Sequence, residues 1–438
     1  ISDLFQKLSV QKAGDPIRLV CELYKVFKEE TQSQETLDDF YFWGELLISD
    51  FDDVDKNMVD ADKLFSNLQD LKNLMDDYDF LDEEQEEAIQ QFFQNFSIER
   101  RTELKEKFIS LWDKLGAIYH RYQENLTELG IAYEGMLYRN VIEQLDTDRL
   151  KYDKYIFVGF NVLNKVEHQF FKLLQDADKA MFYWDYDVFY TRQIKKHEAG
   201  EFLKRNLRDF PNELPESCFD SFKSPKKIRY ISASTENAQA RFLPEWVKGI
   251  ANDQSQIAEE NEKENAVVLC NEALLLPVLH SIPQEVKNVN ITMGFPLAQT
   301  PVYSFINAAM ELQTNGYRTD TGRFTYEAVS AILKHPYTQQ LSTHAISLEN
   351  DLTRTNRFYP LPSELKQDDF LANLFTPRSG IKDLCDYLVG LIKDISTIYR
   401  KEGEYNDIFN QLYRESLFQS HLKINRLYSL IESGELNV

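Results

Sequence analysis

Residues that break helices and strands are scarce in this sequence. Its 438 residues include only 15 glycines and 13 prolines. Few breakers, together with many leucine, glutamate, lysine and glutamine residues, favour long helices, so the composition predicts a helix-rich fold. Hydrophobic residues make up 43% of the chain, with 30 Phe and 23 Tyr, which excludes a disordered chain. The length predicts roughly two to four domains.

Cysteines and long apolar runs are also few. The four cysteines, Cys21, Cys218, Cys270 and Cys385, lie far apart, which excludes zinc-type spacing and argues against a disulfide framework. No run of about 18 apolar residues is present, and no charged-then-apolar signal opens the chain. We therefore expect a soluble protein of the reducing cytoplasm that has no membrane partner.

Positive charge is the third shortage. Lysine and arginine total 49 against 72 aspartates and glutamates, which gives a formal net charge of −23. Because contacts to phosphate need lysine and arginine, this balance argues against a nucleic-acid binder held by its overall charge. It leaves room for a local basic groove.

The sequence also lacks the common catalytic motifs. It has no Gly-Lys-Ser or Gly-Lys-Thr, so the phosphate-binding P-loop is absent, and it has no HExxH, GxSxG or GxGxxG. The seven histidines are scattered and form no ligand constellation. We predict no metal site, no catalytic residue and no cofactor in this chain.

The hydrophobic pattern changes twice along the chain. Residues 16–150 follow a helical pattern, including the segments 61–74 and 80–96. From Lys154, short apolar strands alternate with helices, and residues 324–438 are helical again. The predicted strands lie at 154–160, 179–187, 226–234, 266–270 and 288–297. Strands that alternate with helices indicate parallel sheets with crossover helices, so the predicted class is a helix-rich α/β fold.

The segment YIFVGFNVLNKVEHQFFKLL, residues 155–174, contains a strand, a tight turn and a helix. In a motor ATPase, such a strand ends in acidic residues that hold magnesium and activate water. Here it ends in Gly159 and Phe160, which can do neither. The simpler interpretation is an ordinary βα unit in which Gly159 permits the turn.

A run of acidic residues, Asp50–Asp55, offers a second place for metal ligands. As a strand end it could bind magnesium. The helical spacing of Phe42, Leu46 and Phe51 instead favours a solvated junction between two helices.

One segment, residues 182–208, combines aromatic and basic residues as single-stranded nucleic acid requires. The candidate DNA-binding residues are Tyr183, Trp184, Arg192, Lys195, Lys196, Lys204 and Arg205. The alternative is that the aromatic side chains are core and the cations form a solvated helix face.

The order of these segments, together with NVNITMGFPL at residues 288–297, resembles superfamily-1 (UvrD-like) helicases. It is most similar to the helicase-like half of the B subunit of bacterial helicase–nuclease (AddAB-type) repair complexes. It also resembles the inactivated helicase region of proteins that carry a C-terminal PD-(D/E)XK nuclease domain. In that resemblance Gly159 and Phe160 stand at the Walker B acids. Asp185 stands at the aspartate of a γ-phosphate-sensing motif whose glutamine is missing.

The resemblance implies RecA-like (P-loop NTPase) parallel-sheet cores with large all-helical insertions. Residues 1–52 would be part of a first core without its N-terminal strand and P-loop, 53–150 a helical insertion, and 151–222 the return to that core. Residues 223–323 would form the second core, and 324–438 its helical insertion.

The implied function is a non-catalytic helicase-like module of a DNA repair nuclease. It would bind single-stranded DNA and scaffold a PD-(D/E)XK nuclease outside this chain, either a C-terminal domain or a nuclease or helicase partner subunit. One alternative is an active ATPase that uses ATP and magnesium, with its P-loop upstream and its acids from Asp50–Asp55 or Asp185. Another is a protein-interaction scaffold that binds no DNA, which the net charge favours.

Overall fold

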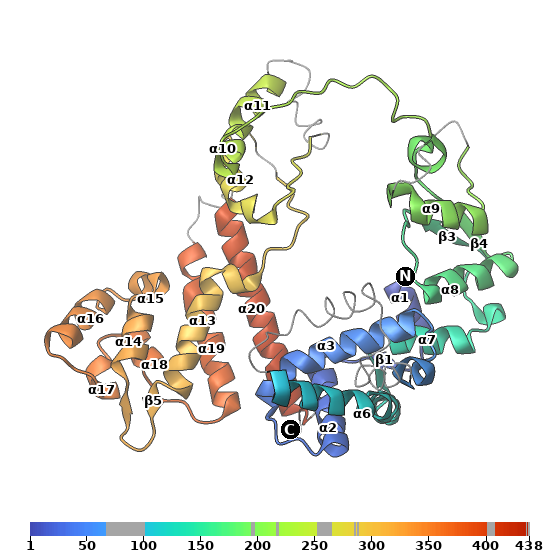
Figure 1. The fold of residues 1–438 in the computed structure, drawn as a ribbon. Coiled ribbons are helices and arrows are strands. Elements are labelled where there is room, and N and C mark those ends of the chain that lie inside the picture. Colours follow the sequence, from blue (N-terminus) through green and yellow to red (C-terminus); the bar gives the residue numbers. More distant parts are fainter. Residues whose placement is uncertain are drawn as a thin grey trace. The chain divides into compact units, whose positions relative to one another are not determined.

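The computed structural model describes residues 1–66, 101–193, 198–215, 219–251, 265–283, 286, 289–400, 408–434 and 436. The helix predicted at 80–96 and most of the one predicted at 61–74 lie outside these residues. By their internal contacts the residues form two compact units (Figure 1). Unit 1 comprises Ile1–Lys227 with Leu436–Val438, and unit 2 comprises Ile228–Glu435.

The first part of unit 1 is helical, as the sequence predicts. Its elements are α1 (Ser2–Leu8), β1 (Lys12–Ala13), α2 (Pro16–Thr31), α3 (Leu37–Lys56), α6 (Arg101–Glu128), β2 (Ile131–Ala132), α7 (Glu134–Gln144) and a 3-10 turn, Thr147–Arg149. A capping box between Thr36 and Asp39 starts α3. Gly130, at a φ of 68°, follows the end of α6, a position that favours glycine. Strands β1 and β2 pair in parallel.

A β-α-β unit follows at the predicted place. Strand β3 (Tyr155–Val158), helix α8 (Lys165–Asp176) and strand β4 (Ala180–Tyr183) succeed one another, and the two strands pair in parallel from Tyr155 opposite Ala180 to Val158 opposite Tyr183. Helix α8 turns Val166, Phe170, Phe171 and Leu174 into the core, where they are fully buried. The predicted strands and the predicted parallel pairing are therefore confirmed for this β-α-β segment. The chain then continues through a π-helical turn (Phe189–Gln193) into α9 (Glu198–Asp209).

The first part of unit 2 differs from the prediction. Helix α10 (Glu236–Arg241) ends and α11 (Leu243–Ala251) begins just before Pro244. A break there is expected, because proline is tolerated in the first turn of a helix and disrupts its interior. The described residues of 226–234, 266–270 and 288–297 form no strand. Tyr230 is 90% exposed and Val268 is 83% exposed. An apolar strand needs a neighbouring strand and a covering layer; the described residues provide neither, so the predicted second parallel sheet is wrong here.

The rest of unit 2 is a helical domain with a small hairpin. Its elements are a 3-10 turn (Glu272–Leu274), α12 (Leu275–Ser281), a second 3-10 turn (Leu297–Gln299), α13 (Pro301–Thr314), β5 (Tyr317–Arg318), β6 (Arg323–Phe324), α14 (Tyr326–Leu333), α15 (Pro336–Leu341), α16 (Ala345–Arg354), α17 (Pro362–Leu365), α18 (Asp369–Leu374), α19 (Ile381–Ser396), a third 3-10 turn (Ile398–Arg400) and α20 (Ile408–Glu432). Apolar side chains of α13, α14, α18 and α19 form its core. The helical pattern predicted from residue 324 onward is confirmed.

The protein is helix-rich, and its described sheets contain two strands each. The more specific division into RecA-like cores and insertions stays a prediction. In the part of the chain that the structure describes, no helix is both long and apolar enough to cross a membrane.

Candidate functional site

The corner after β3 is where a motor ATPase would hold magnesium. Gly159 has a φ of 78°, a conformation that suits glycine, and no atom lies within 4 Å of the place where its Cβ would be. The Phe160 ring packs edge-on against Phe171 at 5.4 Å and against Phe157 at 6.2 Å. The Phe160 side chain therefore packs with the hydrophobic residues beside β3. Neither Gly159 nor Phe160 has a side-chain oxygen that could bind a metal ion.

Two aspartates follow β4, at the same sheet edge. Asp185 is exposed. The carboxylate of Asp187 accepts the backbone N–H groups of Phe189 at 2.9 Å and Phe222 at 2.8 Å. These bonds hold its pKa below the usual range. Asp187 thus shapes the turn after β4, and Asp185 is the single exposed acid of the pair.

Trp184, a predicted DNA contact, is 1% exposed. Its ring stacks on Phe182 and Phe210, and its indole N–H donates to the carbonyl oxygen of Phe210 at 3.2 Å. Asn212 also accepts from the Trp184 backbone N–H. The prediction that Trp184 stacks on a base is wrong for this structure, because the core occupies both the ring and its donor.

The other predicted DNA-binding residues are a half-buried tyrosine, cations that already have partners, and two lysines outside the described residues. Tyr183 is half-buried at the end of β4. On α9, Arg205 forms an ion pair with Glu201 at 2.9 Å, and neither Arg192 nor Lys204 is without a partner. Lys195 and Lys196 lie outside the described residues. Among the described residues of this segment, the cations Arg192, Lys204 and Arg205 therefore each have a partner.

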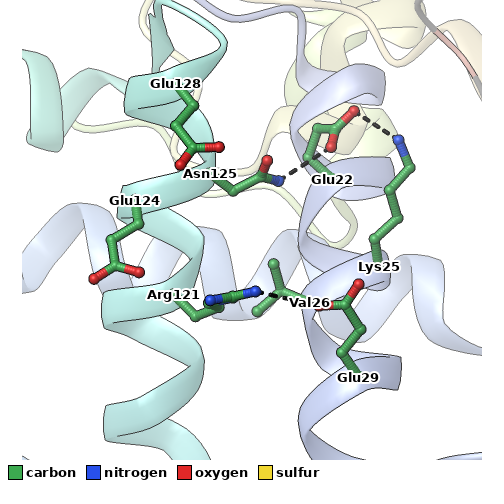
Figure 2. A pocket seen from close by; sticks show the side chains of 8 residues that line it. All are labelled: Glu22, Lys25, Val26, Glu29, Arg121, Glu124, Asn125 and Glu128. Carbon is green, nitrogen blue, oxygen red and sulfur yellow. Dashed lines mark hydrogen bonds and ion pairs between the residues drawn. The ribbon is translucent and has the colours of Figure 1, made fainter.

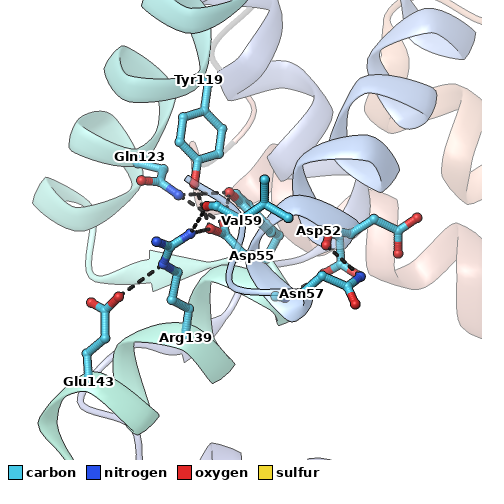
Figure 3. A network of polar contacts seen from close by, with 11 residues as sticks. Asp52, Asp55, Asn57, Val59, Tyr119, Gln123, Arg139 and Glu143 are labelled. Carbon is cyan, nitrogen blue, oxygen red and sulfur yellow. Dashed lines mark hydrogen bonds and ion pairs between the residues drawn. The ribbon is translucent and has the colours of Figure 1, made fainter. Parts of the chain in front are cut away.

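The acidic run Asp50–Asp55 lies near the end of α3, and Asp55 is fully buried. Its carboxylate accepts from the hydroxyls of Tyr119 at 2.6 Å and Tyr133 at 2.5 Å, and from the Gln123 amide at 3.0 Å. The Arg139 guanidinium donates to it at 3.2 Å (Figure 3). The expected solvated junction is wrong for Asp55, which ties α3 to α6 and α7.

The hydrogen bonds to the Asp55 carboxylate stabilise the packing of α3 against α6 and α7. Burial, reinforced by the Asp55 carboxylate, raises the pKa of the Tyr119 and Tyr133 hydroxyls well above their usual value. Both hydroxyls therefore remain donors at neutral pH. Charge-assisted bonds of this kind satisfy a buried carboxylate completely, and they leave Asp55 no free lone pair toward a metal ion.

A hollow of about 200 Å³ lies between α2 and α6 (Figure 2). Four glutamates line it together with two cations: Glu22, Glu29, Glu124, Glu128, Lys25 and Arg121. Lys25 is paired with Glu22 at 2.8 Å, and Arg121 approaches Glu29 at 4.0 Å. The surplus of carboxylates repels phosphate, so this hollow does not suit a nucleotide or a DNA strand.

A second hollow, of about 510 Å³, lies in unit 2 beside the β5–β6 hairpin. Its lining is basic and aromatic: Arg318, Thr321, Arg323, Asn356, Arg357, Phe358 and Tyr359. We call this set the arginine–aromatic surface. The sequence analysis missed it because its residues come from two separate segments. The available signal was an arginine on each side of a short glycine-containing turn.

Among the described residues, no three histidine, cysteine, aspartate or glutamate side chains gather closely enough to hold a metal ion. Comparisons with protein-family models, curated proteins and solved structures found no match to this chain.

Proposed function

We propose that this chain is a non-catalytic, helicase-like module of a DNA repair or recombination system. It binds single-stranded DNA and scaffolds a PD-(D/E)XK nuclease that lies outside this chain. In this proposal the β3–α8–β4 unit is the remnant of a RecA-like core. Gly159 and Phe160 occupy its degenerate metal corner, and Asp185 is a remnant of phosphate sensing.

The observation that carries the proposal is the corner after β3. There, parallel strands, a tight turn and a helix follow one another, an arrangement that a nucleotide-dependent motor shares with other α/β proteins and that supports the proposal. The two positions that would carry acids hold a glycine, with no atom within 4 Å of its Cβ position, and a partly buried phenylalanine that packs against the core. A fold can keep its binding surfaces after its chemistry is lost, because stacking and backbone contacts need a groove and no magnesium.

The test is a magnesium-dependent ATPase assay with and without a 20-nucleotide single strand. We expect no turnover by the wild-type chain, and none after Gly159→Asp with Phe160→Glu, provided that circular dichroism shows a folded variant. Turnover that disappears in Asp185→Ala would instead support an active ATPase. A chain that neither hydrolyses ATP nor binds a single strand at any salt concentration is a protein-interaction scaffold.

The nuclease part of the proposal has its own expectation. A strand carrying the acid and lysine pattern of PD-(D/E)XK enzymes should be encoded beyond Val438 or by a neighbouring gene. Mixing that nuclease with this chain should give a complex in analytical ultracentrifugation. Separate sedimentation at micromolar concentrations would contradict the scaffold role.

A further inference from the structure

We propose that the arginine–aromatic surface of unit 2 binds single-stranded nucleic acid, with phosphate held by Arg318 and Arg323 and a base stacked on Phe358. The inference rests on the proposed function and gives its DNA contact a location. It moves that contact away from residues 183–208.

The first support is an unfavourable charge pair in the hairpin. Arg318 and Arg323 stand directly opposite each other in the antiparallel pairing of β5 and β6. Like charges in that position destabilise a two-stranded ribbon. Neither arginine forms an ion pair with any described residue. An anion between the two side chains would remove the repulsion, and arginine suits phosphate because its donors form a planar fork.

The second support is the exposure of the neighbouring aromatic rings. Phe358 is 64% exposed and Tyr359 is 48% exposed. The Arg318 guanidinium lies 5.1 Å from the centre of the Tyr359 ring, so one face of that ring is already covered by a cation. The Phe358 ring remains the more accessible platform, and every nucleobase has a face that can stack on it.

The surface is held in place by its backbone. The Tyr326 N–H donates to the carbonyl of Phe358 at 2.9 Å, and the Phe324 N–H donates to that of Pro360 at 3.0 Å. The Arg323 guanidinium donates to the carbonyl of Tyr359 at 2.9 Å. These bonds fasten the segment with the rings to the strand with the arginines. Little order has to be created on binding, which favours affinity.

The nearby described acids form no ion pair with the two hairpin arginines, but Glu364 does interact with one of them. The Leu361 N–H and the charges of Arg357 and Arg323 lower the pKa of Glu364. Glu364 is paired with Arg357 at 2.5 Å. Asp320 is exposed in the hairpin turn, and its carboxylate accepts the Thr321 N–H at 2.9 Å. In a chain with a net charge of −23, a polyanion can approach only where cations are locally in excess, and this surface meets that condition.

The experiment is fluorescence anisotropy of a labelled 20-mer of deoxythymidine between 50 and 200 mM salt. The variants are Arg318→Ala with Arg323→Ala, and Phe358→Ala alone. The matched control is Arg354→Ala with Lys382→Ala, which removes the same charge from unit 2 at residues paired with Asp351 and Glu432. We expect each surface variant to weaken binding by roughly tenfold or more, and the control by less than about twofold.

Further ligands define the site. An abasic 20-mer should bind more weakly than the deoxythymidine strand and should be insensitive to Phe358→Ala. A uridine 20-mer that binds more tightly assigns the surface to RNA, which supports the inference and contradicts the DNA part of the proposed function. Poly-glutamate that competes as well as the strand would show an acidic-protein site and overturn the inference.

Two failures can be told apart. If the wild-type chain binds the strand and the surface variants match the control, the inference is wrong and the proposed DNA binding stands. If the wild-type chain binds no strand at 50 mM salt, both are wrong. Phe358→Ala guards against a folding artefact, because its exposed ring contributes little to the core.

Discussion

Two regions of this protein combine aromatic rings with cations, and they use them in opposite ways. In residues 182–210 of unit 1, the Trp184 ring is covered by Phe182 and Phe210, and Arg205 is paired with Glu201. In the arginine–aromatic surface of unit 2, the rings are exposed, and Arg318 and Arg323 have no ion pair among the described residues. The same residue types therefore build a core in one place and an open surface in the other.

The difference shows that composition does not decide whether an aromatic–cationic segment can bind a ligand. What matters is whether the ring faces have already been covered and whether the charges have already been neutralised. Burying an aromatic ring stabilises the fold and removes it from contact with any partner. An exposed ring beside an arginine remains accessible for stacking by a ligand.

The largest expected effect is on stability in unit 1. Trp184→Ala should destabilise this unit by about 3–5 kcal/mol, because it leaves a cavity beside Phe182 and Phe210. Chemical denaturation followed by circular dichroism measures this. A loss below about 1 kcal/mol would mean that the ring is not a core residue and that the contrast between the two regions fails.

The next effect tests the buried network of the same unit. Asp55→Ala should destabilise unit 1 by about 3 kcal/mol, because it leaves Arg139 and the Tyr133 hydroxyl without their buried acceptor. Asp50→Ala, at an exposed position on the same helix, is the matched control and should stay within about 0.5 kcal/mol of wild type. Equal effects of the two changes would contradict a structural role for Asp55.

A smaller effect is expected in unit 2 from Arg318→Lys. Lysine keeps the charge but loses the planar fork and the contact with the Tyr359 ring. Affinity for the single strand should fall by roughly three- to tenfold, while the dependence of affinity on salt should be unchanged, since the number of neutralised phosphates is the same. An affinity equal to that of the wild-type chain would show that one positive charge is sufficient at this position and would contradict the role given to the planar fork.

The smallest effect is expected from Arg205→Ala on α9. This arginine is exposed and already paired with Glu201. Its removal should therefore change the affinity for the single-stranded 20-mer by less than about twofold. Anisotropy under the same conditions measures it. A loss as large as that of the Arg318 and Arg323 variant would restore residues 183–208 as the DNA contact.

Local sequence patterns predicted the fold well where the elements that pack together are neighbours in the sequence. The β3–α8–β4 unit was predictable because two short apolar runs flank an amphipathic helix, and the three pack on one another. The segments around Tyr230 and Val268 are just as strand-like in sequence, but the described chain gives them no neighbouring strand. A high strand propensity means that a segment fits into a sheet, but the segment forms a strand only where a neighbouring strand is present to pair with it.

The candidate site was harder to predict, for a related reason. Trp184 is buried by Phe210, a residue 26 positions away, and Asp55 is buried by donors on α6 and α7. Arg318 and Phe358 line the same hollow, although the helices α14, α15 and α16 separate them in the sequence. Exposure and proximity of this kind are set by long-range packing, which a pattern of neighbouring residues does not contain.

Photocrosslinking tests the contrast between the two regions most directly. A single strand carrying 5-iodouracil is bound to the wild-type chain, irradiated and digested, and the crosslinked peptides are identified by mass spectrometry. We predict crosslinks to Phe358 or Tyr359 and none to Trp184. Crosslinks to Tyr183 and Trp184, with the Phe358 peptide unmodified, would contradict the account.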